Sequence, residues 1–196
     1  MLASITPLGE RGRRASWAVT VSAFGLGSTV AGVGAGAIVG AAGSLVLSGS
    51  IADPARLDAL AAALAAAIAL DLLAGATPGP RRQVNERWLY ELRSWVYGLG
   101  FGAQLGLGVA TVVSSAATYV AVIAALLTGD AGRGALVLGC FGAARGLTLL
   151  AAAHVRRPAQ LLALHARLQR WRRPARRLVL AGEVAIAVLA AVWSLA

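Results

Sequence analysis

The segment between Arg14 and Asp53 contains no charged side chain. A soluble core cannot bury a run of this length on every side, whereas a helix of about 20 apolar residues crosses the roughly 30 Å hydrocarbon layer of a bilayer. The composition agrees, because 58% of the residues are hydrophobic and 13% are charged, against about 45–50% and about 25% in soluble domains. We therefore expect an integral membrane protein.

Five apolar runs predict membrane spans at about 16–48, 57–75, 95–128, 134–154 and 178–195. Their residues do not alternate between polar and apolar as barrel strands do, so the spans are expected to be helices. The predicted fold class is all-α: a polytopic helical membrane bundle that forms one integral membrane domain over the whole chain, 1–196. The first run is too long for the hydrophobic part of a signal peptide, and the loop-like opening MLASITPLGERGRR leaves room for a further span upstream.

The arginines predict the orientation of these spans. All 18 basic residues except Arg56, Arg133 and Arg145 lie before the first span, between the second and third, or between the fourth and fifth. Because cytoplasmic loops carry the excess of positive charge, the N-terminus is expected in the cytoplasm and the C-terminus outside the cell membrane. The net charge of +10 is distributed among apolar runs, which favours anionic lipid over nucleic acid as the partner of the basic loops.

Two of the basic loops have the pattern of helices that lie on the membrane surface. In residues 158–173 an apolar stripe faces away from the arginines, and the prolines at 158 and 174 are expected to begin and end the helix. A similar pattern predicts a second interfacial helix at about 81–95. This second segment is expected to be an elbow between spans, with a docking surface for a cytoplasmic partner as the alternative.

Two predicted spans, 16–48 and 95–128, would each make a helix of roughly 50 Å, too long for a straight crossing. They must tilt, protrude or break. Each places three glycines on one helical face: Gly32, Gly36 and Gly40 in the first, and Gly98, Gly102 and Gly106 in the second. This spacing favours close packing between helix backbones. Broken helices that frame a binding site at the middle of the membrane are the alternative.

Arg145 interrupts an apolar stretch, FGAARGLTLL (141–150). A central arginine costs about 2.5–3.5 kcal/mol to insert, so it should face the bundle interior, a water-filled cavity or an acidic partner. Glu183 is the expected partner, with Asp71 at a similar depth in the second span, and Gln104 and Tyr119 are candidates for the same cavity. Such a cluster either holds helices together or binds an anion, a proton or a small polar substrate.

The sequence gives little indication of catalytic, metal-binding or disulfide chemistry. Cys140 is the only cysteine, which excludes an internal disulfide and a cysteine zinc cluster. No combination of nucleophile, base and orienting carboxylate is evident. We expect neither enzymatic activity nor a metal or other cofactor.

The segments GLGFGAQLGLGVATVVSSAATYV and FGAARGLTLL resemble membrane cores of the DsbD and CcdA type, which implies glycine- and proline-broken helices that carry reducing equivalents through a cysteine pair. That pair is absent here, so no catalytic residue is carried over. The segments RQVNERW (82–88) and WVYGLGFG (95–102) resemble uncharacterised actinobacterial multi-pass proteins, a resemblance that implies no activity.

Taken together, these residues predict a membrane protein that binds or transports a small polar or anionic solute around Arg145. The alternative is a noncatalytic membrane subunit or assembly factor, associated with a partner membrane protein or with further copies of itself. A degenerate redox carrier that uses Cys140 is a more remote alternative.

Overall fold

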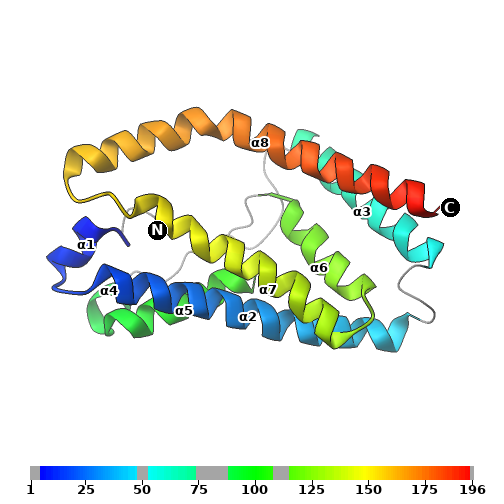
Figure 1. Ribbon diagram of the computed structural model, residues 1–196, viewed down its shortest axis with the longest axis horizontal. Helices are drawn as coiled ribbons and strands as arrows, with labels where there is room; N and C mark the ends of the chain where they lie inside the picture. The colour runs from blue at the N-terminus through cyan, green and yellow to red at the C-terminus, as the bar shows by residue number, and fades with distance from the viewer. Residues whose placement is uncertain (1–4, 48–52, 74–87, 108–114, 195–196) are drawn as a thin grey trace.

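The computed structural model describes residues 5–47, 53–73, 88–107 and 115–194, and Figure 1 shows that these residues form helices joined by short connections. The helices are α1 (Pro7–Gly12), α2 (Trp17–Val46), α3 (Pro54–Leu73), α4 (Trp88–Glu91), α5 (Ser94–Gly106), α6 (Ala117–Leu127), α7 (Ala131–Leu147), the 3-10 helix η1 (Thr148–Ala152) and α8 (Pro158–Ser194). The all-α prediction is confirmed for the described part of the chain.

Three of these helical segments are long and apolar enough to cross a membrane: Trp17–Val46, Ala131–Ala152 and Pro158–Ser194. They correspond to the first, fourth and fifth predicted spans. The number of five spans and their orientation stay predictions.

The helices α2, α5 and α7 form a closely packed group in which glycines face the backbone of a neighbouring helix (Figure 1). A Cβ atom added at Gly36 would meet the backbone carbonyl of Gly134 in α7, and one added at Gly134 would meet the carbonyl of Gly36. A Cβ atom at Gly102 of α5 would similarly meet the carbonyl of Phe24 in α2. The two predicted glycine faces are therefore packing surfaces, in which the absence of a side chain brings the backbones together.

The two long predicted spans differ from each other. The first is an unbroken helix, α2, and so does not provide the broken element that a transporter-like site would need. The second is divided into α5, which ends at Gly106, and α6, which begins at Ala117. Residues 108–114 lie outside the described residues.

The helix α3 packs on α8 and also holds both ends of α6. At the start of α6, the Asp71 carboxylate accepts hydrogen bonds from the Ser115 hydroxyl (2.7 Å) and the Ala116 backbone N–H (2.9 Å). At its end, the Arg56 guanidinium donates to the carbonyls of Leu127 (3.3 Å) and Thr128 (3.5 Å). A carboxylate thus lies at the positive end of the α6 dipole and a guanidinium at the negative end, the arrangement that stabilises a short helix.

The prediction of two helices in the C-terminal region, 158–173 and 178–195, is wrong, because α8 is a single helix over Pro158–Ser194 with Pro174 inside it. Proline removes one backbone hydrogen bond from a helix interior. The arginines and alanine on either side of Pro174 are good helix formers and continue the helix across it. Every residue from 165 to 179 is exposed, so the basic part of α8 is not covered by the described helices.

The prediction of one interfacial helix over 81–95 also needs correction. Residues 81–87 lie outside the described residues, and the helix of 88–91 ends before a bend at Leu92 and Arg93. Trp88 stacks on Phe101 of α5, with ring centroids 5.8 Å apart and planes 6° from parallel. The aromatic contact folds α4 back on α5, so this segment makes a turn in the described structure.

Candidate functional site

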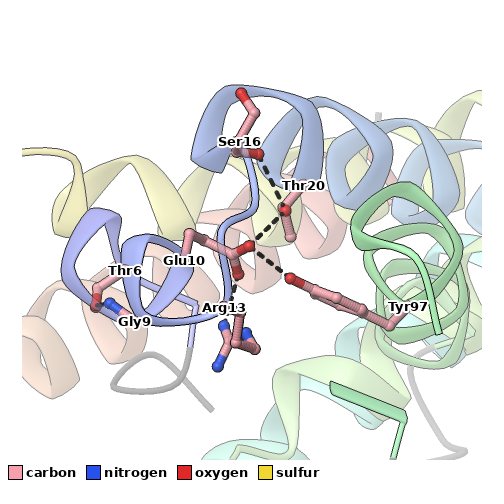
Figure 2. Close-up of polar contacts among 7 residues, drawn as sticks. All are labelled: Thr6, Gly9, Glu10, Arg13, Ser16, Thr20 and Tyr97. Atoms are coloured by element: carbon pink, nitrogen blue, oxygen red, sulfur yellow. Dashed lines mark hydrogen bonds and ion pairs between the residues drawn. The ribbon is translucent and has the colours of Figure 1, made fainter. Parts of the chain in front are cut away.

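A buried carboxylate, Glu10 of α1, organises the end of the bundle where α1, α2 and α5 meet (Figure 2). Its side chain is 0% exposed. It accepts hydrogen bonds from the Arg13 guanidinium (2.7 Å), the Thr20 hydroxyl of α2 (3.1 Å) and the Tyr97 hydroxyl of α5 (2.5 Å). Three side chains are therefore held by one carboxylate that joins α1 to α2 and α5, which satisfies the requirement that a buried charge be paired and hydrogen-bonded.

The local sequence explains why Glu10 lies at this position. Thr6 precedes α1, and its hydroxyl accepts a hydrogen bond from the Gly9 N–H (3.0 Å), while Pro7 occupies the first turn of the helix. These are the residues that usually begin a helix. The short helix α1 then directs the Glu10 side chain toward α2 and α5, and places Arg13 beside Glu10.

Arg13 is held on two sides. In addition to the ion pair with Glu10, its guanidinium carbon lies 5.8 Å from the centre of the Tyr97 ring, within the range of a cation–π contact. Burial alone would lower the pKa of Arg13, but the hydrogen bond and the negative charge of Glu10 outweigh burial and raise the pKa above its ordinary value. Arg13 is therefore a fixed cation.

A cavity of about 650 Å³ opens beside this network, and three arginines line it: Arg13, Arg14 and Arg93. Ser94 and Trp95, the first two residues of α5, also line the cavity. The first N–H groups of a helix have no partner within the helix and carry its positive dipole end. Three arginine residues and the first residues of α5 thus line one cavity.

The wall of the cavity is partly apolar. Leu89 and Leu92 line it together with the Trp95 ring. Leu92 and Trp95 are 39% and 52% exposed, so the apolar wall continues to the surface of the described structure. A ligand with an anionic group and an apolar portion would find complementary surfaces for both.

Arg14 has a backbone angle φ of 55°, in the left-handed region. This conformation is uncommon for residues other than glycine, and asparagine and aspartate adopt it more readily than arginine does. Strained residues of this kind are concentrated at functional sites, where the surrounding structure maintains them. The position of Arg14 in the cavity wall agrees with that tendency.

The structure places the four predicted site residues on four different helices. Gln104 is in α5, Tyr119 in α6, Arg145 in α7 and Glu183 in α8, and the first three are half-buried. Their role in substrate binding stays a prediction.

Arg145 lies in the last turn of α7, where its guanidinium carbon is 5.4 Å from the centre of the Phe141 ring. The position agrees with the preference of cations for the negative end of a helix dipole. The contact with Phe141, one turn earlier on the same helix, covers part of the charged group. Local interactions of α7 therefore accommodate this arginine.

The expected pairing of Arg145 with Glu183 is not formed. Glu183 is 5% exposed, and both of its carboxylate oxygens are buried without a hydrogen-bond partner among the described residues. The acidic residue that acts electrostatically on Glu183 is Asp71, in the neighbouring helix α3. The pairing fails because α8 packs on α3, as Figure 1 shows.

The Glu10 network is not predicted from the sequence, because its residues are distant along the chain. Tyr97 is 87 positions from Glu10, and no helical period connects the two. The one local signal is that Glu10 is the only acidic residue before Asp53 and precedes Arg13 by three positions, the spacing of a helical ion pair. In the sequence, the arginines beside it have the pattern of loop charges that set the membrane orientation.

Comparison with known proteins adds no assignment, because the chain matches no family model, no curated protein and no solved structure. Within the described ranges, no three histidine, cysteine, aspartate or glutamate side chains are grouped as a metal site would require. Cys140 is exposed on α7. The function is therefore inferred from the cavity and from the charged groups of this chain alone.

Proposed function

We propose that this is an integral membrane protein that binds an anionic, phosphate-bearing ligand in the cavity between α1, α4 and α5. The observation that carries the proposal is the presence of three arginines and the start of α5 around one cavity of about 650 Å³. The proposal retains the class of ligand expected from the sequence, an anionic solute, and places it at Arg13, Arg14 and Arg93 instead of Arg145.

Phosphate groups suit this site for physical reasons. Guanidinium groups bind phosphate through paired, charge-assisted hydrogen bonds, and helix N-termini bind phosphate through free N–H groups. Arg13 is held in place before a ligand arrives by Glu10, which reduces the entropy lost on binding. A neutral or cationic ligand would not balance the positive charges of Arg14 and Arg93, whereas Arg13 is already paired with Glu10.

The phosphate group of the ligand could belong to a lipid headgroup or to a free phosphate compound. The apolar wall of Leu89, Leu92 and Trp95 favours a lipid, whose acyl chains would lie along it. The experiment must therefore offer both sources. Native mass spectrometry of the purified protein counts retained phosphatidylglycerol against phosphatidylcholine, and isothermal titration calorimetry measures the binding of inorganic phosphate.

Arg93→Gln is the most direct variant, since Arg93 lines the cavity and is not one of the three side chains that donate hydrogen bonds to Glu10. Loss of one phosphate contact is expected to weaken binding about tenfold, which corresponds to about 1.4 kcal/mol. Arg133→Gln is the matched control. Arg133 is exposed near the start of α7, outside the cavity, and its replacement changes the net charge by the same amount. Equal weakening by both variants would attribute binding to net charge and reject the site.

A second membrane role is supported by the basic part of α8. Residues 165–179 are all exposed, and they include six of the arginines expected on the cytoplasmic side. A basic helix of this kind binds the anionic membrane surface, and each arginine near the surface contributes about 1 kcal/mol at moderate salt. We propose that this segment lies against anionic lipid headgroups.

The measurement is the electron paramagnetic resonance accessibility of a spin label at residue 168 in nanodiscs. With anionic lipid the label should be shielded from a water-soluble relaxing agent, and the shielding should decrease as salt is raised. Equal shielding in neutral and anionic nanodiscs, or no effect of salt, would exclude the electrostatic contact.

Transport past Arg145 is a separate proposal, and it needs water access at residue 145. An Arg145→Cys variant in a Cys140→Ala background should react with membrane-impermeant thiol reagents from one side if a hydrated path exists. An unreactive residue 145, with exposed cysteines reacting normally, would favour the noncatalytic subunit. Copurification of a stoichiometric membrane protein would then identify its partner.

A further inference from the structure

A pair of carboxylates from α3 and α8, Asp71 and Glu183, lies apart from the arginine-lined cavity and takes no part in the function proposed above. The helices α3 and α8 pack directly on each other. Arg176 of α8 donates a hydrogen bond to the Asp71 backbone carbonyl, and Glu183 lies seven positions, or about two turns, further along the same face of α8. The negative charge of Asp71 acts on Glu183 across this contact.

The two carboxylates have opposite surroundings. Asp71 accepts hydrogen bonds from the Ser115 hydroxyl (2.7 Å) and the Ala116 N–H (2.9 Å), and it faces the N-terminus of α6. Donors and a helix dipole of this kind stabilise the anion. The Asp71 carboxylate is therefore held in place by donors from the start of α6.

Glu183 receives no such support. It is 5% exposed, and both oxygens are buried without a hydrogen-bond partner among the described residues. An isolated buried carboxylate is very costly, and a group in this position takes up a proton instead. The neighbouring anion adds to that preference, because two carboxylates that share a site cannot both be ionised cheaply.

We propose that Asp71 and Glu183 form a proton-binding site in which Glu183 binds and releases one proton beside the hydrogen-bonded carboxylate of Asp71. Among the described residues, the charged groups at this site include Asp71 from α3 and Arg176 from α8, while α6 contributes the Ser115 hydroxyl and the Ala116 amide. Arg176 is exposed and bonds to the backbone of Asp71, so it leaves the Glu183 carboxyl group without a donor. Ionisable residues within membrane segments mark proton and ion pathways in many transporters, which is the role this site would support.

The test uses dicyclohexylcarbodiimide, an apolar reagent that modifies protonated carboxyl groups, on the full chain in lipid nanodiscs. Mass spectrometry of peptides locates the modified residue. Glu183 is expected to be labelled at neutral pH, and the labelling rate is expected to fall as the pH rises through the titration of the site. Glu183→Gln removes the label.

The variant that tests the pair is Asp71→Asn. Removing the neighbouring negative charge lets Glu183 ionise more easily, so the midpoint of the labelling profile should move to lower pH by about one unit, and labelling above the midpoint should slow about tenfold. Asp58→Asn is the control: Asp58 is an exposed acid on the same helix, and its removal should leave the profile of Glu183 unchanged.

Three results would overturn the proposal. The first is absence of Glu183 labelling at every pH when an unfolded sample labels normally. The second is an unchanged profile in a folded Asp71→Asn variant, with folding checked by size-exclusion chromatography. The third is protection of Glu183 by sodium ions at constant pH, which would assign the site to a metal cation.

Discussion

The α2–α5–α7 group and the α3–α8 pair are both built from apolar helices, yet they are held together in different ways. In the first, glycines on facing helices allow backbone to touch backbone, as at Gly36 and Gly134. In the second, Gly182 of α8 has no atom within 4 Å of its Cβ position, and the buried residues include the ionisable side chains of Arg56 and Glu183. Glycine contacts therefore determine position in the first region, whereas in the second Arg176 of α8 donates a hydrogen bond to the Asp71 carbonyl of α3 and Arg56 joins α3 to the end of α6.

The largest effect should come from filling a glycine contact. In Gly36→Val, the new side chain would collide with the Gly134 carbonyl, which is rigid backbone, and we expect a loss of more than about 4 kcal/mol or no folded protein. Gly34→Val on the same helix is the control, since the Cβ position at Gly34 has no neighbour within 4 Å. Thermal unfolding in detergent measures both. Similar melting temperatures for the two variants would show that the close packing of α2 with α7 is not required.

Removal of the buried carboxylate tests whether polar groups also determine position in the first region. Glu10→Ala leaves Arg13 and the Tyr97 hydroxyl without their acceptor, and breaking a buried ion pair in this way costs about 3 kcal/mol. Glu10→Gln keeps an acceptor and should cost less. The unfolding free energy of the two variants, with Glu91→Ala as an exposed control, provides the measurement. Equal stability of Glu10→Ala and the parent would remove Glu10 from the account of this end of the bundle.

The attachment of α3 to α6 should be weaker than either of these contacts. Arg56→Met keeps much of the side-chain volume but loses the hydrogen bonds to the carbonyls of Leu127 and Thr128. Because both bonds are long, we expect a loss of about 1 kcal/mol. Hydrogen exchange of the last turn of α6 should increase in this variant while α2 stays protected. Increased exchange throughout the bundle would mean that the two regions unfold as one unit.

The smallest expected effect is an increase in stability. Gly182→Ala adds a methyl group where there is open space, and alanine is the better helix former, so α8 should be stabilised by about 0.5 kcal/mol or slightly more. Thermal unfolding compares this variant with Gly32→Ala, which meets the Leu138 carbonyl and should be destabilised. A loss of stability in Gly182→Ala would indicate that α8 is as closely packed as α2.

The contrast between the regions also explains what could be predicted. Glycine faces repeat with the period of a helix, so Gly32, Gly36 and Gly40 could be recognised as one surface before any partner was known. The contacts of Glu10 and Arg56 depend on which helices become neighbours, and no local pattern contains that information. The pairing of Arg145 with Glu183 failed for this reason: both charges were recognised, but their helices pack elsewhere.

The continuity of α8 has a mechanical consequence. The exposed arginines and Glu183 belong to one helix of 37 residues, so a rotation of the basic end about the helix axis turns the Glu183 side chain through a corresponding angle. Pro174 permits bending between the two halves, since it removes one backbone hydrogen bond, but the covalent backbone still transmits torsion. A change in the contacts of the arginines would therefore change the orientation of a buried carboxyl group several turns away on the same helix.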